Sequence, residues 1–187
     1  MTEPATATDG RRARGQRRRA ELIAATLAVV ERDGVAGVTH RAVAREAGCP
    51  ASSAVYYFAT LDELLVAALT AAAEDYARQL REIVDSGSDG IDGIARLIAD
   101  AGGPGRTRAV AERELTLLAA RRPALRPIAR HWREKVADAA AEHTDDPRTI
   151  QTVVDVADGI CARVLMGTEP VAFEEIRGAL RHALRLD

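Results

Sequence analysis

The chain has 187 residues, of which 47% are hydrophobic, 29% charged and 3% aromatic, which is ordinary for a globular protein of one or two small domains and excludes a wholly disordered chain. The formal net charge of −2 is unevenly distributed, because residues 1–60 hold nine Arg against six acidic residues, a balance of +3, and the remainder carries −5. Such asymmetry is expected where one end faces a polyanion, although a basic tail beside an ordinary domain gives the same numbers.

The sequence also limits the compartment and the chemistry. Residues 1–10 lack the apolar segment of a secretory signal, and the longest apolar run, Leu64 to Ala73, is too short to span a bilayer. Cys49 and Cys161 lie far apart without metal-ligand spacing, and the four histidines form no HExxH motif or short cluster. No Gly-rich phosphate loop or GxSxG motif is present. We therefore predict a cytoplasmic protein that is not an enzyme and has neither a metal nor another cofactor.

The distribution of residue types predicts an all-α fold. Ala, Leu and Arg are abundant, Gly and Pro fall between apolar-periodic segments, and no run alternates as a strand does. We expect about nine helices in three regions: a disordered basic arm over residues 1–15, a three-helix domain with a helix-turn-helix over residues 16–60, and a helical bundle over residues 61–187.

The N-terminal region is rich in arginine. Six arginines lie in the arm and at the start of the first helix: Arg11, Arg12, Arg14, Arg17, Arg18 and Arg19. Such a cluster can cross a phosphate backbone or enter a minor groove, and a solvated tail is the alternative. The first helix is predicted over residues 16–33, because apolar residues share one face and Gly34 can end it.

The stretch that organises the chain is VTHRAVAREAGCPASSAVYYFATLDELL, residues 38–65. Thr39 can cap a helix, Gly48 can end it, and Pro50 can stand in the first turn of the next. That next helix, residues 51–58, is very short, begins with small or hydroxylic residues and ends in aromatic ones. Small leading residues allow close approach to a DNA groove, and hydroxyl groups can reach phosphates or bases. An ordinary helical hairpin has the same spacing.

The ordered pattern of this stretch resembles the N-terminal DNA-binding domain of the TetR family of bacterial transcriptional regulators. The resemblance covers residues 17–69 and rests on Thr39, Val43-Ala44, Ala47-Gly48, Phe58 and the run Thr60 to Leu65. Three residues depart from the family pattern. Val55 stands where a backbone-contacting Tyr is usual, Leu61 where a phosphate-contacting Lys is usual, and Ser52 where a Gly often stands. Either of the next two tyrosines could supply the missing phosphate contact.

The resemblance, together with the residue types, predicts a set of DNA contacts. His40 and Arg41 open a helix whose positive N-terminus suits phosphate, and Ser52, Ser53 and Tyr56 are placed nearest the bases. The full set is Arg17, Arg18, Arg19, Thr39, His40, Arg41, Ser52, Ser53, Tyr56, Tyr57 and Thr60.

The C-terminal region reads as a series of helices. Thr60-x-x-Glu63 is a capping box that predicts the start of a long fourth helix over residues 61–84, which could transmit movement between the domains. Further helices are expected over residues 91–101, 106–122, 123–143, 147–167 and 173–184. Asp146 is the predicted N-cap of the fourth of these, with Pro147 in its first position.

The TetR resemblance implies that the last two long helices form a homodimer interface. The predicted interface residues are Val153, Val154, Ala157, Ile160, Val164, Phe173, Ile176, Leu180 and Leu184. The alternative is that these helices close the monomer's own core. A dimer would place two short helices in successive major grooves of double-stranded DNA at a palindromic operator.

The resemblance also implies an inducer pocket in the C-terminal bundle. The candidate lining residues are Arg113, Glu114, Leu117, Leu118, His131, Trp132 and Met166. For Trp132 the alternative is a core position, and for Arg113 and Glu114 it is a solvated face. We therefore predict a ligand-responsive homodimeric repressor, released from DNA by an unknown small-molecule inducer. The alternative is a helical bundle that acts through protein contacts without specific DNA binding, which the residues Val55 and Leu61 keep open.

Overall fold

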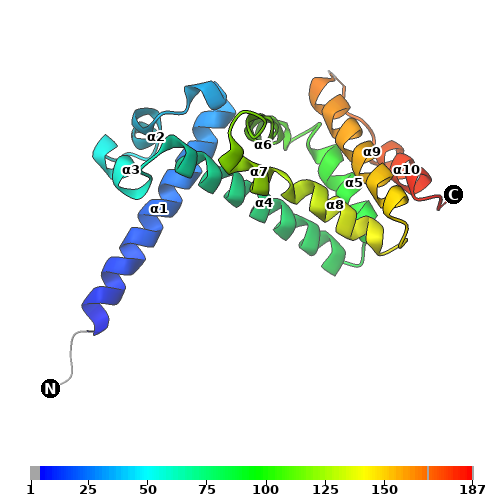
Figure 1. The fold of residues 1–187 in the computed structure, drawn as a ribbon, viewed down its shortest axis with the longest axis horizontal. Helices are drawn as coiled ribbons and strands as arrows, with labels where there is room; N and C mark the ends of the chain where they lie inside the picture. Colours follow the sequence, from blue (N-terminus) through cyan, green and yellow to red (C-terminus); the bar gives the residue numbers. More distant parts are fainter. Residues whose placement is uncertain (1–4, 168, 187) are drawn as a thin grey trace. The chain divides into compact units, whose positions relative to one another are not determined.

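The computed structural model describes residues 5–167 and 169–186 (Figure 1). In this part of the chain the regular secondary structure consists of ten α-helices and two 3-10 helices, without a strand. The fourth-last α-helix, α7, is a single turn over Arg126–Ala129 that only Arg130 separates from α8. The predicted all-α fold of about nine helices is therefore confirmed.

The chain divides into two compact units, Met1–Ala68 and Leu69–Asp187, here called unit 1 and unit 2. The boundary lies eight residues later than predicted. The first two turns of helix α4, with Leu64 and Leu65 fully buried, belong to unit 1. Helix α4, Leu61–Asp85, therefore runs through the boundary without a break.

Unit 1 is a three-helix domain followed by the start of α4. Its core includes Leu22, Val29, Val43 and Phe58, all nearly inaccessible to solvent. Helix α1 packs against α2, and α2 packs against α3. The elements are α1 (Ala5–Asp33), η1 (Val35–Gly37), α2 (His40–Glu46) and α3 (Ala51–Tyr57).

The predicted disordered arm is wrong for residues 5–15, because helix α1 already begins at Ala5. Residues 1–4 lie outside the described residues. Alanine and arginine are strong helix formers, and no proline stands between residues 5 and 49. Nothing in the sequence therefore stops the helix before residue 16, and two glycines alone do not interrupt it.

The turn between α2 and α3 follows the predicted pattern. The Thr39 hydroxyl accepts a hydrogen bond from the Ala42 N–H at 3.0 Å. Gly48 is left-handed, with a φ of 61°, its N–H donates to the Arg45 carbonyl, and the Cys49 N–H donates to the Ala44 carbonyl. These two bonds form the Schellman arrangement that satisfies the end of a helix. Pro50 is the N-cap of α3 and not its first residue.

The capping box at the start of α4 is confirmed. The Thr60 hydroxyl accepts a hydrogen bond from the Glu63 N–H at 3.1 Å. The Glu63 carboxylate accepts one in return from the Ala59 N–H at 2.9 Å, one residue earlier than the usual partner. This end of α4 is thereby fixed next to α3.

Unit 2 is a helical bundle built on the rest of α4. Helix α5 packs against α8, α9 and α10, and α9 also packs against α8 and α10. Asp146 caps α9 as predicted, accepting hydrogen bonds from the N–H groups of Arg148 and Thr149 at 3.2 Å. The elements are α5 (Gly90–Asp100), α6 (Arg106–Leu118), η2 (Pro123–Leu125), α7, α8 (His131–Ala141), α9 (Pro147–Met166) and α10 (Phe173–Ala183).

Two predicted helices of unit 2 are shorter than expected. Helix α6 ends at Leu118, and Arg122 is extended, as is typical of a residue before proline. The segment predicted as one helix over residues 123–143 is divided into η2, α7 and α8. Pro127 lacks the N–H that an unbroken helix would need at that position.

The residues predicted for the dimer interface lie in the core of the single chain. Phe173 is partly buried and packs against this core, and the others are buried, with at most 8% of their surface exposed: Val153, Val154, Ala157, Ile160, Val164, Ile176, Leu180 and Leu184. Their shared apolar face is turned towards the neighbouring helices of unit 2. In the single chain these side chains therefore belong to the core, as the alternative interpretation expects.

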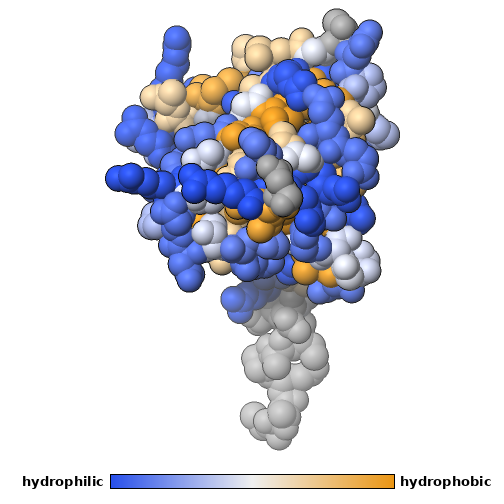
Figure 2. Space-filling model, turned by 90° about the vertical axis from the view of Figure 1, so that its right-hand side faces the viewer, coloured by the Kyte–Doolittle hydropathy of each residue, from blue (hydrophilic) through white to orange (hydrophobic). Residues whose placement is uncertain are grey.

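The surface of unit 2 near α10 is mixed in character. Figure 2 views this side and shows apolar patches separated by polar ones, without one continuous apolar face. Both Gly159 on α9 and Gly178 on α10 are exposed, and a Cβ added at either position would meet no atom within 4 Å. Among the described residues, no single helix is long and apolar enough to cross a membrane, and α3 with α4 passes that test only as a pair bent by 76°.

Candidate nucleic-acid interface and ligand cavity

The short helix α3 presents one side to unit 1 and the other to solvent. Ala54 and the following Phe58 are buried, which fixes the helix on the domain core. On the opposite side Ser52 is exposed, Val55 is 50% exposed and Tyr56 is 82% exposed. An exposed hydroxyl and an exposed phenol on a short helix after a tight turn can reach the base edges or phosphates of a DNA groove.

The two tyrosines of α3 differ in their surroundings. Their rings meet edge to face with centroids 5.1 Å apart. Tyr57 is half-buried, and its hydroxyl lies 3.8 Å from the place where a Cβ on Gly15 would stand. Tyr57 thus lies beside α1, and Tyr56 is the tyrosine that faces solvent. Ser53 is also half-buried.

Several residues predicted to contact DNA also stabilise unit 1. The His40 ring Nε2 is 2.8 Å from the Phe58 carbonyl, so that it joins the start of α2 to the end of α3. Thr39 and Thr60 cap helices, as described above. Arg19 lies over the Phe58 ring at 5.0 Å, and Arg18 pairs with Glu21 at 2.7 Å. Arg17 and Arg41 are exposed.

Unit 2 contains a cavity of about 120 Å³ that is lined by residues of helices α4 to α9. Its wall is largely aliphatic and includes two aromatic rings, those of Tyr76 and Trp132, whose centroids are 5.7 Å apart. Polar lining groups include Glu112, Thr116 and Cys161. An apolar cavity with aromatic rings and a few polar groups is typical of small-molecule sites.

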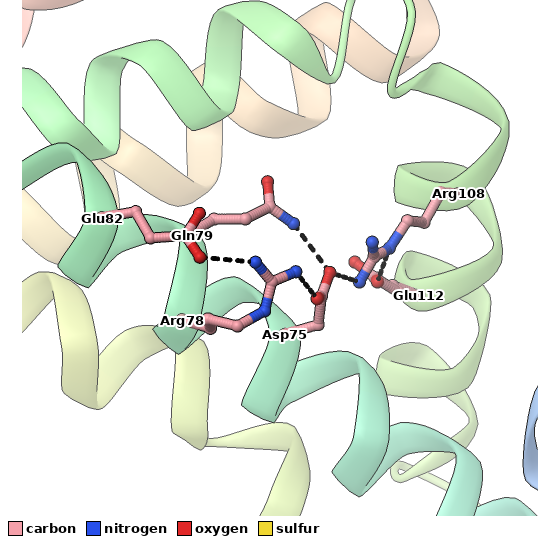
Figure 3. A network of polar contacts seen from close by, with 6 residues as sticks. All are labelled: Asp75, Arg78, Gln79, Glu82, Arg108 and Glu112. Atoms are coloured by element: carbon pink, nitrogen blue, oxygen red, sulfur yellow. Dashed lines mark hydrogen bonds and ion pairs between the residues drawn. The ribbon is translucent and has the colours of Figure 1, made fainter. Parts of the chain in front are cut away.

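Glu112 is the buried acid of this wall. The guanidinium Nε of Arg108 donates to Glu112 Oε1 at 2.9 Å, while Glu112 Oε2 is buried without a hydrogen-bond partner. Arg108 also pairs with Asp75 on α4 (Figure 3). Asp75 in turn accepts hydrogen bonds from Arg78 and Gln79. The network therefore ties α6 to α4 through one arginine.

The cavity shifts the pKa of its titratable groups. Burial raises the pKa of Glu112 to about 7, although Arg108, bonded to Oε1, and the neighbouring Tyr76 hydroxyl act in the opposite direction. Burial and the neighbouring Glu112 raise the pKa of Tyr76, and burial raises that of the Cys161 thiol. Burial acts to raise the pKa of Asp75 as well, but its arginine and glutamine partners outweigh it and hold that pKa below the usual value.

The sequence identified only part of this wall. Arg113, His131 and Trp132 line the cavity as predicted. The other four predicted residues do not line it: Glu114, Leu117, Leu118 and Met166. Leu117 is 61% exposed and Met166 is 80% exposed, because they lie on the outer faces of α6 and α9.

Glu112, Tyr76 and Cys161 were missed by the sequence prediction. Glu112 stands three residues from both Ala109 and Leu115, which are buried, so it falls in line with the inward face of α6. A charged residue in register with an apolar stripe is the pattern that could have identified it.

Comparison with known proteins agrees with both units. Residues 85–186 match a family described as tetracyclin repressor-like, C-terminal domain. The multidrug binding protein EbrR, solved with ethidium, is 43% identical over 89% of this chain and 97% of that chain, with a TM-score of 0.77. EbrR has also been solved with malachite green and with proflavin.

A second solved structure, the TetR-family member SCO1917 from Streptomyces coelicolor A3, is also 43% identical. It covers 89% of this chain and 97% of its own, with a TM-score of 0.78. No curated protein matches. The match over residues 85–186 and these identities show that the chain belongs to the TetR family of DNA-binding transcriptional regulators.

Proposed function

We propose that this regulator is a cytoplasmic homodimeric repressor that binds a palindromic operator and is released when a small molecule occupies the cavity of unit 2. The observation that carries the ligand-responsive part is the pairing of a buried, half-satisfied Glu112 with the aromatic rings of Tyr76 and Trp132.

DNA binding is assigned to the exposed side of α3 and to the basic residues around it. Ser52 and Tyr56 are the proposed groove contacts. Both are exposed on one side of α3, and the buried Ala54 on the other side holds the helix on the core of unit 1. Arg17 and Arg41 are the proposed phosphate contacts. His40 has the supporting role of holding α2 to α3. Any DNA contact would be additional to a structural role for four of the predicted residues: Thr39, Thr60, Arg18 and Arg19.

The proposed dimer uses the outer faces of α9 and α10, not the buried residues expected from the sequence. Gly159 and Gly178 leave open space at the centre of those faces, which favours close approach of a second pair of helices. Two copies of α3 held about 34–36 Å apart would read successive major grooves. One α3 of seven residues reads too few bases for specificity.

The proposed ligands are aromatic cations. Ethidium and malachite green, with which EbrR was solved, are aromatic dyes with a positive charge. A carboxylate beside two neighbouring aromatic rings, whose planes meet at 52°, suits such a molecule, because the rings attract a cation through their faces and the carboxylate neutralises it. Trp132 is the single tryptophan of the chain and lines the cavity, so its fluorescence reports occupancy directly.

The test has two stages. Duplex selection at moderate salt should enrich a palindrome, and malachite green should then release the protein from that duplex in an anisotropy assay. The variant Glu112→Gln should bind the same duplex equally well but respond less to the dye. This comparison separates release through the cavity from binding of the dye to DNA. If no palindrome is enriched, the alternative of a helical bundle acting through protein contacts is favoured.

A further inference from the structure

Most of the acidic side chains that the structure describes are exposed to solvent, and a few are partly buried. Of the acidic side chains that the structure describes, only Glu112 is buried, with 7% of its surface exposed. Its Oε2 and the Nε of Arg181 are the buried side-chain atoms without a partner in this part of the chain. Burying an ionised carboxylate with one oxygen unsatisfied is costly, so a group that satisfies this oxygen is strongly favoured.

A count of charges around Glu112 indicates what that group is. The network of Figure 3 holds two guanidinium groups, those of Arg78 and Arg108. Asp75 and Glu82 already balance them. An ionised Glu112 is therefore a third negative charge, and the network has no third cation for it. Either a proton or an incoming cation completes the balance.

The other charged groups of the cavity wall pair with residues other than Glu112 or shift the pKa of another group. Arg133 pairs with Asp155 and Asp158, and Lys135 pairs with Asp138. His131 lies 3.8 Å from Glu134. Arg113 also lines the cavity, and its charge acts on the pKa of Cys161. The groups that act on Glu112 are Arg108 on its own helix and Asp75 and Tyr76 on α4.

We propose that a ligand cation and a proton compete for the free oxygen of Glu112, so that this residue selects aromatic monocations and couples their binding to the release of one proton. The inference rests on the proposed role of the cavity as the ligand site. In the empty cavity the carboxyl group keeps its proton and is neutral. When the cation enters, the O–H bond breaks, the proton passes to solvent, and the carboxylate pairs with the cation.

Burial raises the pKa of Glu112 into the neutral range, so the proton is held firmly enough to compete and loosely enough to leave. Arg108 remains on the other oxygen in both states, and Asp75 holds the far side of that guanidinium. The two interactions keep Arg108 from turning to the free oxygen. That oxygen stays directed at the ligand.

Ethidium is the probe of choice, because its charge is permanent and any pH dependence of its binding belongs to the protein. Its affinity for the full-length protein is measured by quenching of Trp132 fluorescence. Linkage predicts that the affinity rises about 30-fold between about pH 5.5 and about pH 8.5 and levels off above neutrality. Calorimetry near pH 6 in two buffers of different ionisation enthalpy should show release of close to one proton per ethidium.

Two variants test whether the pH dependence of ethidium affinity comes from Glu112. Glu112→Gln cannot exchange a proton, so its ethidium affinity should be independent of pH and near that of the wild type at low pH. Glu114→Gln changes an exposed acid two residues along the same helix and should keep the full pH dependence. Circular dichroism at each pH verifies that the variants are folded.

Three outcomes would contradict the inference. If ethidium binds the wild type with constant affinity and releases no proton, proton exchange is wrong, while the cavity still stands as a ligand site. If Glu112→Gln retains the pH dependence, another group exchanges the proton. If ethidium does not bind at any pH, both this inference and the proposed ligand class fail, whereas operator binding is tested independently by duplex selection.

Discussion

At the scale of single residues, Glu112 is a buried acid whose ionisation lowers the stability of the folded protein. Arg108 satisfies one oxygen, and the other has no partner. Its pKa of about 7 lies above the ordinary 4.5, so the folded protein binds this proton more tightly than the unfolded chain does. Stability contributed by this group is therefore full below about pH 4.5 and lost as the pH rises to about 7.

This shift predicts that Glu112→Gln stabilises unit 2 at high pH. The amide carries no charge, so the variant lacks the loss of about 3 kcal/mol that ionisation imposes on the wild type. The difference in unfolding free energy between variant and wild type should increase by about 2 to 3 kcal/mol from about pH 5 to about pH 8. Urea titrations followed by Trp132 fluorescence measure this difference. Equal pH dependence for wild type and variant would show that Glu112 is ionised throughout.

At the scale of elements, the turn between α2 and α3 sets the direction of α3, the helix proposed to contact DNA. Gly48 adopts a φ of 61°, which costs about 1–2 kcal/mol for a residue with a Cβ. No atom lies within 4 Å of the place where that Cβ would stand, so the cost is one of backbone conformation and not of collision. The buried Ala54 then fixes how α3 is rotated.

We expect Gly48→Ala to lower the stability of unit 1 by about 1 kcal/mol. Hydrogen exchange of the α2 and α3 amides measures this loss of stability, because these amides exchange when unit 1 unfolds. Gly15→Ala is the matched control in unit 1. Gly15 lies within α1 without a positive φ, so alanine there should not lower stability. Equal effects of the two changes would mean that the left-handed turn is not required.

At the scale of the whole molecule, the proposed dimer depends on faces that the single chain leaves uncovered. The apolar faces of α9 and α10 are buried in the core of unit 2. What remains outside is a mixture of polar residues, small residues and the exposed Met166. A dimer formed there would be held by close helix contact more than by a large apolar area.

The variant Gly178→Arg should turn the dimer into a monomer without unfolding it. A Cβ added at Gly178 meets no atom within 4 Å and the position is exposed, so an arginine there can extend into solvent and would displace a partner. Sedimentation at micromolar concentration should give twice the monomer mass for the wild type and the monomer mass for the variant. Ala120→Arg, at an exposed turn after α6, should stay dimeric. A wild-type monomer would contradict the proposed interface.

Much of unit 1 could be predicted from the sequence, because its helix caps and its turn depend on residues close together in the chain. Thr39, Gly48 and the Thr60–Glu63 box act within a few residues, so their roles follow from spacing alone. The start of α1 was missed because arginine-rich polar segments occur both in disordered arms and in exposed helices. The preference of alanine and arginine for helix decided the outcome here.

Tertiary relations explain what the sequence could not predict in unit 2. The apolar faces of α9 and α10 suit a core or an interface equally well from sequence alone, and only the positions of α5 and α8 show that in the single chain they face the core. The cavity joins residues from six helices, α4 to α9. Its key pairs, Tyr76 with Glu112 and with Trp132, connect positions far apart in the chain.

Helix α4 has a mechanical consequence. Its 25 residues include neither glycine nor proline, so it has no built-in hinge. Tyr76 in the cavity wall lies fifteen positions after Leu61, which is about 22 Å along the axis at 1.5 Å per residue. In the proposed release mechanism, a straight helix of that length would convert a rotation of about 5° at the cavity into a shift of about 2 Å at its first residue. A displacement of that size is comparable with the tolerance of a hydrogen bond to a base edge.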